Sequence, residues 1–181
     1  MTVYLLVGLP GAGKTTRAKE LEASGPALRL TPDEWQTAIF DTDPPDGWRS
    51  PDRAAHRARI EGKLLETGMR AARLGLDVVL DFGLWSRDER SALRWIAASH
   101  GLTSEVLHLP VTIAEQRERI AGRSAQPGQF AMTEADFVAW QARFEAPQPE
   151  ELDGAAIPPS PPGFADWSHW AAERWPSWSG R

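Results

Sequence analysis

Short apolar runs alternate along the chain with segments whose apolar residues recur at helical spacing. The run Val78-Val79-Leu80 is continuously apolar, as expected for a strand that is buried on both faces. This alternation predicts an α/β fold in which helices cover both faces of a mostly parallel sheet. The expected strands are 3–7, 28–30, 77–82 and 104–109, and the expected helices are 16–23, 53–74, 86–99, 112–123 and 133–144.

The pattern changes after Glu145. Residues 146–162 are rich in proline, which disfavours helices and central strands, so we expect an extended connector over the surface. The tail beyond it holds four of the nine tryptophans and could form a short amphipathic helix. We therefore predict one domain over residues 1–147, followed over 148–181 by a connector and a tail whose rings pack onto the domain. A tail that presents its rings to a partner or substrate is the alternative.

The composition is that of an ordinary globular protein, with 41% hydrophobic and 25% charged residues among 181. Apolar runs are too short to span a bilayer, and the N-terminal run lacks the basic lead of a signal peptide, so we expect a cytoplasmic protein without a membrane segment. The absence of cysteine excludes disulfides, thiolate metal sites and thiol nucleophiles. A net charge of −5 disfavours broad nucleic-acid binding, although a local basic groove is left open.

Residues 8–15 match the phosphate-binding pattern G-x-x-x-x-G-K-[ST] at every required position, between an expected strand and an expected helix. In such a loop, backbone N–H groups surround phosphate oxygens, Lys14 reaches the β and γ phosphates and the Thr15 hydroxyl holds Mg²⁺. The positive end of the following helix points at the same anion. The chain has no asparagine and so lacks the Asn-Lys-x-Asp signature of guanine recognition, which favours ATP. The expected nucleotide-binding residues are Gly8, Leu9, Pro10, Gly11, Ala12, Gly13, Lys14, Thr15 and Thr16.

Phosphoryl transfer also needs a carboxylate beside the attacking hydroxyl. Asp33 follows the second expected strand, at the sheet edge where an acceptor would dock, and is the candidate base. An alternative explains the same residues structurally: Thr31 caps a helix that begins at Pro32, and Asp33 and Glu34 complement the helix dipole. The sequence leaves both interpretations open.

A second carboxylate is expected to hold the metal. Asp81 ends a buried apolar strand, as the second acidic motif of nucleoside triphosphatases does, and we expect it to hold Mg²⁺ together with Thr15. The alternative is a polar residue that caps the loop after the strand. The four histidines show no metal-ligand spacing, so Mg²⁺ is the cation that we predict.

Arginines are the candidate cations over the developing charge. Arg119 and Arg123 share one face of an expected helix that leads into a Gly- and Pro-containing loop at 124–131. Either could fold over the γ-phosphate as part of a lid around residues 117–133, and both are candidate catalytic residues beside Lys14 and Asp33. Candidates for binding the acceptor are Asp33, Trp35, Arg57 and Arg87, with Arg53, His56, Glu61 and Arg90 as weaker ones, because charged helix faces are usually only solvated.

Several motifs, taken in order, resemble those of the polynucleotide-kinase-like P-loop kinases, of which zeta toxins and chloramphenicol phosphotransferase are relatives. The resemblance covers about residues 1–147. The motifs are residues 8–16, Asp33-Glu34-Trp35, 79–87, 119–123, and Trp140 with 144–147.

This resemblance implies the three-layer P-loop kinase fold, with strand order 2-3-1-4-5 and a helical lid. It further implies ATP and Mg²⁺ as cofactors, an acceptor-activating aspartate at Asp33 and a lid arginine at Arg123 or Arg119. One feature departs from the family. Residues 154–157 are too short and too closely flanked by prolines for a regular fifth strand, so we expect strand five to be rudimentary or absent.

These features predict an ATP-dependent phosphotransferase whose acceptor is a hydroxyl of a small molecule, such as an antibiotic, a sugar or a nucleotide-like compound. A polynucleotide 5′-hydroxyl kinase and an ATP-gated binding protein with little turnover are the alternatives. Residues 41–48 are acidic and turn-rich, which would suit a cationic or polyhydroxyl acceptor, with a plain surface loop as the other interpretation.

Overall fold

Four parallel strands form the central sheet of the computed structural model, which describes residues 1–40, 51–124 and 133–180, apart from the side chains of Pro51, Arg123 and Ser124. The order across the sheet is β2-β3-β1-β4. The predicted α/β fold is therefore confirmed, and within the described residues no fifth strand follows β4. The strands are β1 (Thr2–Val7), β2 (Ala27–Leu30), β3 (Asp77–Gly83) and β4 (Thr103–His108).

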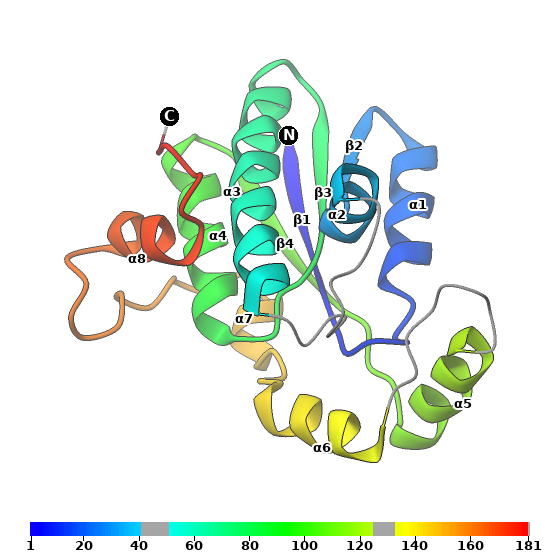
Figure 1. Cartoon of the computed structure of the whole chain (residues 1–181). Coiled ribbons are helices and arrows are strands. Elements are labelled where there is room, and N and C mark those ends of the chain that lie inside the picture. The colour runs from blue at the N-terminus through cyan, green and yellow to red at the C-terminus, as the bar shows by residue number, and fades with distance from the viewer. Residues whose placement is uncertain (41–50, 125–132, 181) are drawn as a thin grey trace.

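The helices flank the sheet in layers. Figure 1 shows α1 on one side of the sheet, α3 and α4 on the other, and α5 and α6 beyond the end at which β1 leads into α1. None of the described helices is long and apolar enough to cross a bilayer. Their bounds are α1 (Lys14–Ser24), α2 (Pro32–Phe40), α3 (Pro51–Arg73), α4 (Arg87–Ser99), α5 (Ile113–Ser124), α6 (Glu134–Arg143), α7 (Pro149–Leu152) and α8 (Trp167–Arg174).

Alternating side chains on β1 and β3 divide the core between the two layers. In β1, Leu5 packs with the residues of α3 and α4, whereas Leu6 packs with those of α1. In β3, Leu80 packs with the residues of α3 and α4, and Val79 packs with those of α1. Because successive side chains of a strand point to opposite faces, Asp81 lies on the same face as Val79, toward α1 and the loop before it.

Local signals set where the helices begin. Ser86 caps α4: its hydroxyl accepts from the Glu89 amide at 3.1 Å, and the Glu89 carboxylate accepts from the Ser86 amide at 3.2 Å. The segment after β2 is helical, as one of the two interpretations requires. α2 begins at Pro32 and carries Asp33 and Glu34 in its first turn.

The proline-rich connector contains a helix, which corrects the expectation of an extended chain over 146–162. Pro149 opens α7 at a position where a missing N–H is tolerated. Glu151 of α7 is buried and receives two hydrogen bonds from Arg90, from Nε at 2.7 Å and from Nη2 at 3.0 Å. A buried ion pair therefore holds α7 against α4.

Acid should weaken this ion pair. Burial raises the pKa of Glu151, but the hydrogen bond and charge of Arg90 outweigh it, so the pKa lies below its usual value of 4.5 in the folded protein. The stabilisation is complete above pH 4.5 and is lost as the pH falls below that value, where the unfolded chain binds the proton more tightly. Glu151→Gln should therefore flatten the loss of stability as the pH falls below 4.5, measured by chemical unfolding. Glu150→Gln, at an exposed neighbour, is the control and should follow the wild type.

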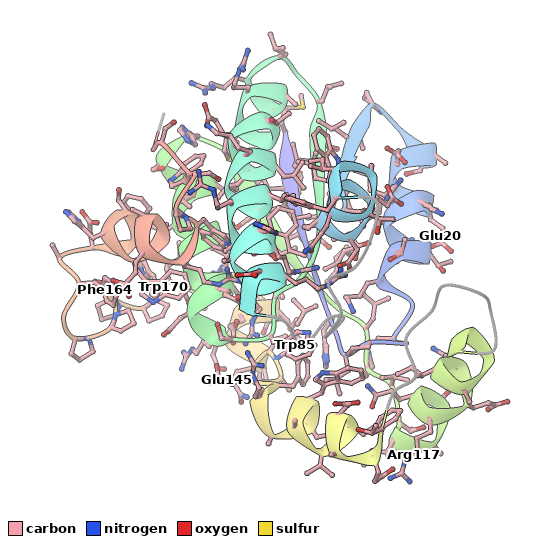
Figure 2. The ribbon with its side chains drawn as sticks, viewed as in Figure 1. Glu20, Trp85, Arg117, Glu145, Phe164 and Trp170 are labelled. Atoms are coloured by element: carbon pink, nitrogen blue, oxygen red, sulfur yellow. The ribbon has the colours of Figure 1, made fainter. Side chains whose placement is uncertain are left out.

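The C-terminal tail packs into the main core, with its tryptophan rings among the residues of α3 and α4. Trp175 is completely buried, and the Trp167 indole N–H donates to the Pro158 carbonyl at 2.8 Å. Trp170, labelled with Phe164 in Figure 2, packs against the same core and contacts the rings of Trp167 and Trp175. The tail thus contributes apolar area to the fold, while the domain boundary at residue 147 stays a prediction.

The chain leaves β3 through a strained turn. Gly83 and Leu84 have φ angles of 98° and 43°, and the left-handed conformation costs a residue with a side chain about 1–2 kcal/mol. Arg90 is fully buried and donates from Nη1 to the carbonyls of Leu84 at 3.3 Å and Glu145 at 2.8 Å. Arg90 therefore joins this turn, the end of α6 and α7.

Candidate active site

The loop between β1 and α1 contains two glycines in left-handed backbone conformations. Gly11 and Gly13 have φ angles of 85° and 92°, in a region that residues with side chains rarely adopt. The Ala12 amide donates to the Leu9 carbonyl at 3.1 Å and folds the loop back on itself. α1 begins directly at Lys14, so the positive end of the helix adjoins the loop.

Lys14 lies over this loop. Its ammonium group donates to the carbonyl oxygens of Gly8 at 2.9 Å and Leu9 at 3.1 Å. A positive charge is therefore held beside the loop amides, where both can act on the same anion.

Thr15 and Asp81 come together as the sequence predicts. The Thr15 hydroxyl donates to Asp81 Oδ2 at 2.8 Å, and the Thr31 hydroxyl reaches the same oxygen at 3.4 Å. Asp81 is buried, and its strand phase directs it toward α1. Hydroxyl and carboxylate oxygens are ligands that Mg²⁺ binds together with water and substrate phosphates, so these residues fit the expected metal.

Asp33 is an exposed carboxylate held by an arginine from another helix. Its side chain is 62% exposed and accepts a hydrogen bond from Arg57 Nη1 of α3. The same guanidinium donates from Nε to Glu61 at 2.8 Å and from Nη2 to the Phe82 carbonyl at 3.0 Å. Arg57 thus connects Asp33 to the end of β3, one residue after Asp81.

The Arg57 guanidinium is securely charged. Burial alone would lower its pKa, but the negative charges of Asp33 and Glu61 outweigh burial and raise the pKa above the usual value. Arg57 and Asp33 therefore form a charged pair at all pH values at which the carboxylate is ionised.

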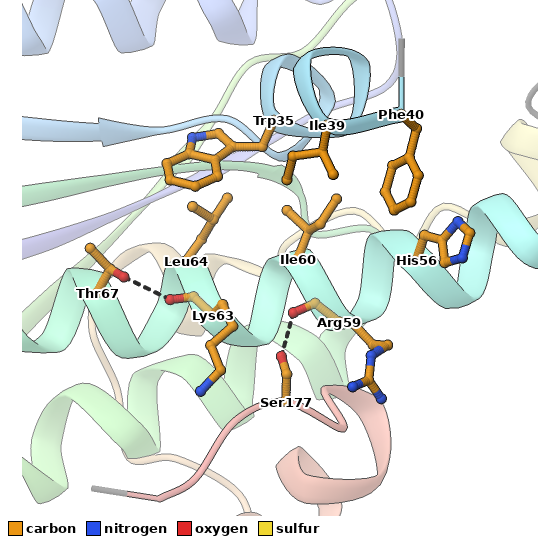
Figure 3. Close-up of a pocket in the computed structure, with 10 residues that line it drawn as sticks. All are labelled: Trp35, Ile39, Phe40, His56, Arg59, Ile60, Lys63, Leu64, Thr67 and Ser177. Carbon is orange, nitrogen blue, oxygen red and sulfur yellow. Dashed lines mark hydrogen bonds between the residues drawn. The ribbon is translucent and has the colours of Figure 1, made fainter. Parts of the chain in front are cut away.

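Trp35 lines a groove between α2 and α3, shown in Figure 3. The groove has a volume of about 380 Å³ and one wall of exposed apolar side chains, Trp35, Ile39 and Phe40. Phe40 stacks on His56 with ring centres 4.3 Å apart, so His56 contacts this groove instead of Asp33. The acidic segment 41–48, expected near an acceptor, lies outside the described residues.

The helix α5 is bonded directly to the phosphate loop. Gln116 is completely buried and donates to the Pro10 carbonyl at 3.0 Å. Arg119 donates from Nη1 to the Gly11 carbonyl at 3.1 Å. The candidate lid helix therefore packs against the phosphate loop, and Arg119 contacts the backbone of that loop.

Apolar packing reinforces this contact. Leu9 of the loop, Ile120 of α5, and Phe137 and Trp140 of α6 form a separate buried cluster. Arg117, labelled in Figure 2, forms an exposed ion pair with Glu134 at the start of α6. Arg123 is in the last turn of α5, but its side chain and residues 125–131 of the predicted loop lie outside the described residues.

Comparison with known proteins identifies the family. A family described as an AAA domain matches residues 3–147, well over half of the chain. The chain belongs to this family. No curated protein gives a significant match.

Solved structures share the fold of this AAA-domain protein. A chain of the Pnkp1/Rnl/Hen1 RNA repair complex aligns with a TM-score of 0.59 and 17% identity over 78% of this chain, which spans only 43% of that longer chain. The APS kinase CysC of Mycobacterium tuberculosis, in complex with AMPPNP and APS, aligns with a TM-score of 0.56 and 19% identity over 81% of this chain and 83% of its own. APE1195 aligns with a TM-score of 0.58 and 22% identity over 82% and 80%. The resemblance to the polynucleotide-kinase-like P-loop kinases is thus confirmed at the level of the fold.

Two arginines after β3 of this AAA domain, Arg87 and Arg90, differ in whether a ligand can reach them. Arg87 has an exposed side chain at the start of α4, and its amide donates to the Glu145 carboxylate at 2.6 Å. Arg90 was a weaker candidate for gripping an acceptor, and the structure corrects this. Its guanidinium is fully buried and bonded to Glu151 and to main-chain carbonyls, so it is not accessible to a ligand.

Some contacts at the site were not predicted from the sequence. Gln116 donates to the phosphate loop, and the Thr31 hydroxyl donates to Asp81. Arg174 of the tail forms an ion pair with Glu61 in α3. For Gln116 a signal existed, since it lies four residues before the apolar Ile120 and therefore on the buried face of its helix. For Arg174 no local pattern indicates the partner.

Proposed function

We propose that this protein is an ATP-dependent phosphotransferase that moves the γ-phosphate of ATP to a hydroxyl group of a small molecule. The observation that carries the proposal is the position of Asp33. An exposed carboxylate is fixed by Arg57 to the end of β3, beside the Asp81–Thr15 pair and the loop that would hold the donor. A kinase needs these parts at one edge of the sheet.

The donor side follows from the loop and the helix behind it. Loop amides and Lys14 would bind the β and γ phosphates, and Arg119, bonded to Gly11, would lie over the transferred group. Thr15 and Asp81 would hold Mg²⁺, which would supply positive charge to neutralise the phosphate oxygens. Arg123 is proposed as a second lid cation.

The acceptor side is built around Asp33. Its carboxylate would orient the attacking hydroxyl and accept its proton, with Arg57 fixing the carboxylate. Trp35 and Arg87 are proposed as further acceptor contacts. The net charge of −5 favours a small molecule over a polyanion.

A screen of ADP release tests the proposal, using nucleosides, sugars, antibiotics and oligonucleotides as acceptors in the presence of ATP and Mg²⁺. We expect one class of small hydroxyl compound to accelerate release. Lys14→Met should lower this turnover by about 10²–10³-fold, because it removes a cation from the transferred phosphates. Lys19→Met, an exposed lysine of the same helix, is the matched control and should leave turnover unchanged.

Other outcomes of the screen would replace the proposal. Release that depends on oligonucleotides and falls steeply with salt would identify a polynucleotide 5′-hydroxyl kinase. Slow release that no acceptor accelerates would identify an ATP-gated binding protein. Calorimetry that finds no binding of ATP to the folded protein with Mg²⁺ would rule out all three.

A further inference from the structure

Glu61 of α3 links the C-terminal tail to the candidate site. Its carboxylate is 2% exposed and accepts from Arg57 Nε at 2.8 Å. From the tail, Arg174 Nη2 forms an ion pair with this carboxylate at 3.0 Å, and the Trp175 indole N–H donates to it at 3.1 Å. A carboxylate this deeply buried needs paired charges and donors, and here two of the three come from the tail.

The arginine that Glu61 holds also holds Asp33. Arg57 uses Nε for Glu61, Nη1 for Asp33 and Nη2 for the Phe82 carbonyl. Because the guanidinium is a rigid plane, fixing Nε determines where Nη1 meets Asp33. A displacement of Glu61 would therefore move the hydrogen bond that orients the candidate base.

A glycine in α3 allows the tail to reach this carboxylate. A Cβ atom at Gly62 would lie 2.4 Å from Ser177 Oγ and 2.8 Å from the Trp178 amide nitrogen. The Ser177 hydroxyl also donates to the Arg59 carbonyl of α3 (Figure 3). The tail thus crosses α3 in direct contact with its backbone, next to Glu61.

Arg174, which contacts Glu61 from the tail, is itself held by a second carboxylate. Arg174 donates to Glu89, from Nε at 2.9 Å and from Nη2 at 2.7 Å, and Glu89 belongs to the cap of α4. Burial alone would lower the pKa of Arg174, but the charges of Glu61 and Glu89 raise it. Negative and positive groups therefore alternate without interruption from Asp33 through Arg57, Glu61 and Arg174 to Glu89.

We propose that the C-terminal tail positions the candidate base, with Arg174 and Trp175 holding Glu61, and Glu61 acting through Arg57 on Asp33. Glu61 is thus a positioning residue, and docking of the tail is part of assembling the site. The inference rests on the proposed function, because the position of Asp33 matters for turnover only if Asp33 orients an acceptor.

The first test does not depend on catalysis. Trp175→Phe removes the indole donor to Glu61 and keeps an aromatic ring, while Trp178→Phe makes the same replacement in the same tail, at a ring that contacts His100. In ¹⁵N NMR of arginine side chains, Trp175→Phe should shift the Arg57 Nε–H signal, assigned by its loss in Arg57→Lys. Trp178→Phe should leave the signal in place. Gly62→Ala keeps every group of the connection but displaces the tail, and it should shift the signal as Trp175→Phe does.

The second test is a double-mutant cycle in phosphoryl transfer. Trp175→Phe should lower kcat by about 10- to 100-fold with an unchanged KM for ATP, since small misplacements of a reacting group are costly. In the Asp33→Asn background the same change should have no further effect, whereas a purely structural role would lower kcat in both backgrounds.

The outcomes separate the inference from the proposed function. An Arg57 signal that moves in neither Trp175→Phe nor Gly62→Ala would overturn the inference, whatever the kinetics. A signal that moves while Asp33→Asn retains full transfer would uphold the structural connection to Arg57 and remove Asp33 from its role. Equal effects of Trp175→Phe with and without Asp33 would show that the tail acts through stability alone.

Discussion

Asp33→Asn is expected to lower phosphoryl transfer by about 10²–10⁴-fold, the range that a positioned general base contributes. The amide keeps the size of the side chain but cannot accept the proton of the attacking hydroxyl. Affinity for ATP should not change, because the nucleotide loop lies on a different segment and Asp33 contacts Arg57 instead. The check is single-turnover transfer from radiolabelled ATP, with nucleotide affinity measured separately by calorimetry.

Glu34→Gln provides the matched control for this experiment. Glu34 is the next residue of the same helix and pairs with Arg29 at 2.9 Å. Its loss should leave transfer intact. If Asp33→Asn transfers as fast as the wild type, the carboxylate serves only the helix dipole, which is the structural interpretation of the acidic pair.

Arg90→Met is expected to cost the largest amount of stability, about 3–5 kcal/mol, because it leaves the buried Glu151 carboxylate without its charged partner. It also removes the donor to the carbonyls of Leu84 and Glu145, which keeps the strained turn after β3 in place. Equilibrium unfolding in urea, followed by tryptophan fluorescence, measures the change.

Two further variants show whether the ion pair is responsible. Arg117→Met breaks the exposed pair with Glu134 and should cost less than about 1 kcal/mol. Combining Arg90→Met with Glu151→Leu removes both charges and should recover much of the stability, since a buried pair replaced by apolar groups costs far less than a broken one. A loss in Arg90→Met as small as that in Arg117→Met would contradict the assigned role.

Variants of the tail should behave differently from both the Asp33 and the Arg90 variants. Trp175→Phe is expected to change both stability and turnover, because the indole donates to Glu61 while its ring lies in the main core. Arg90→Met should act mainly through stability. Comparing the turnover of Trp175→Phe and Arg90→Met at an equal loss of stability separates the effect of packing from the effect of positioning.

Much of the donor side could be predicted from the sequence because its signals are local. The glycines of the phosphate loop, Lys14 and Thr15 lie within one short segment between a strand and a helix. The pairing of Thr15 with Asp81 follows from two further regularities, since neighbouring parallel strands end at the same edge and alternating side chains direct Asp81 toward α1.

Local chemistry also determines where several helices begin. The reciprocal bonds of Ser86 and Glu89 lie three residues apart, so the start of α4 is encoded within one turn. The helix α7 was not predicted, because it depends on a residue far away in the chain. Proline content indicates an extended chain, whereas Pro149 at the first turn and the distant Arg90 permit a helix.

The sequence by itself determined the strands and their parallel arrangement, the phosphate loop and the likeness to a kinase family, because these depend on periodicity and on residues close together in the chain. Only the tertiary structure decided which groups meet across long separations. Gln116 lies 106 residues from Pro10, and Trp175 lies 114 residues from Glu61. No local preference selects such partners, because any buried carboxylate can accept any donor. The packing of α3, α5 and the tail selects them.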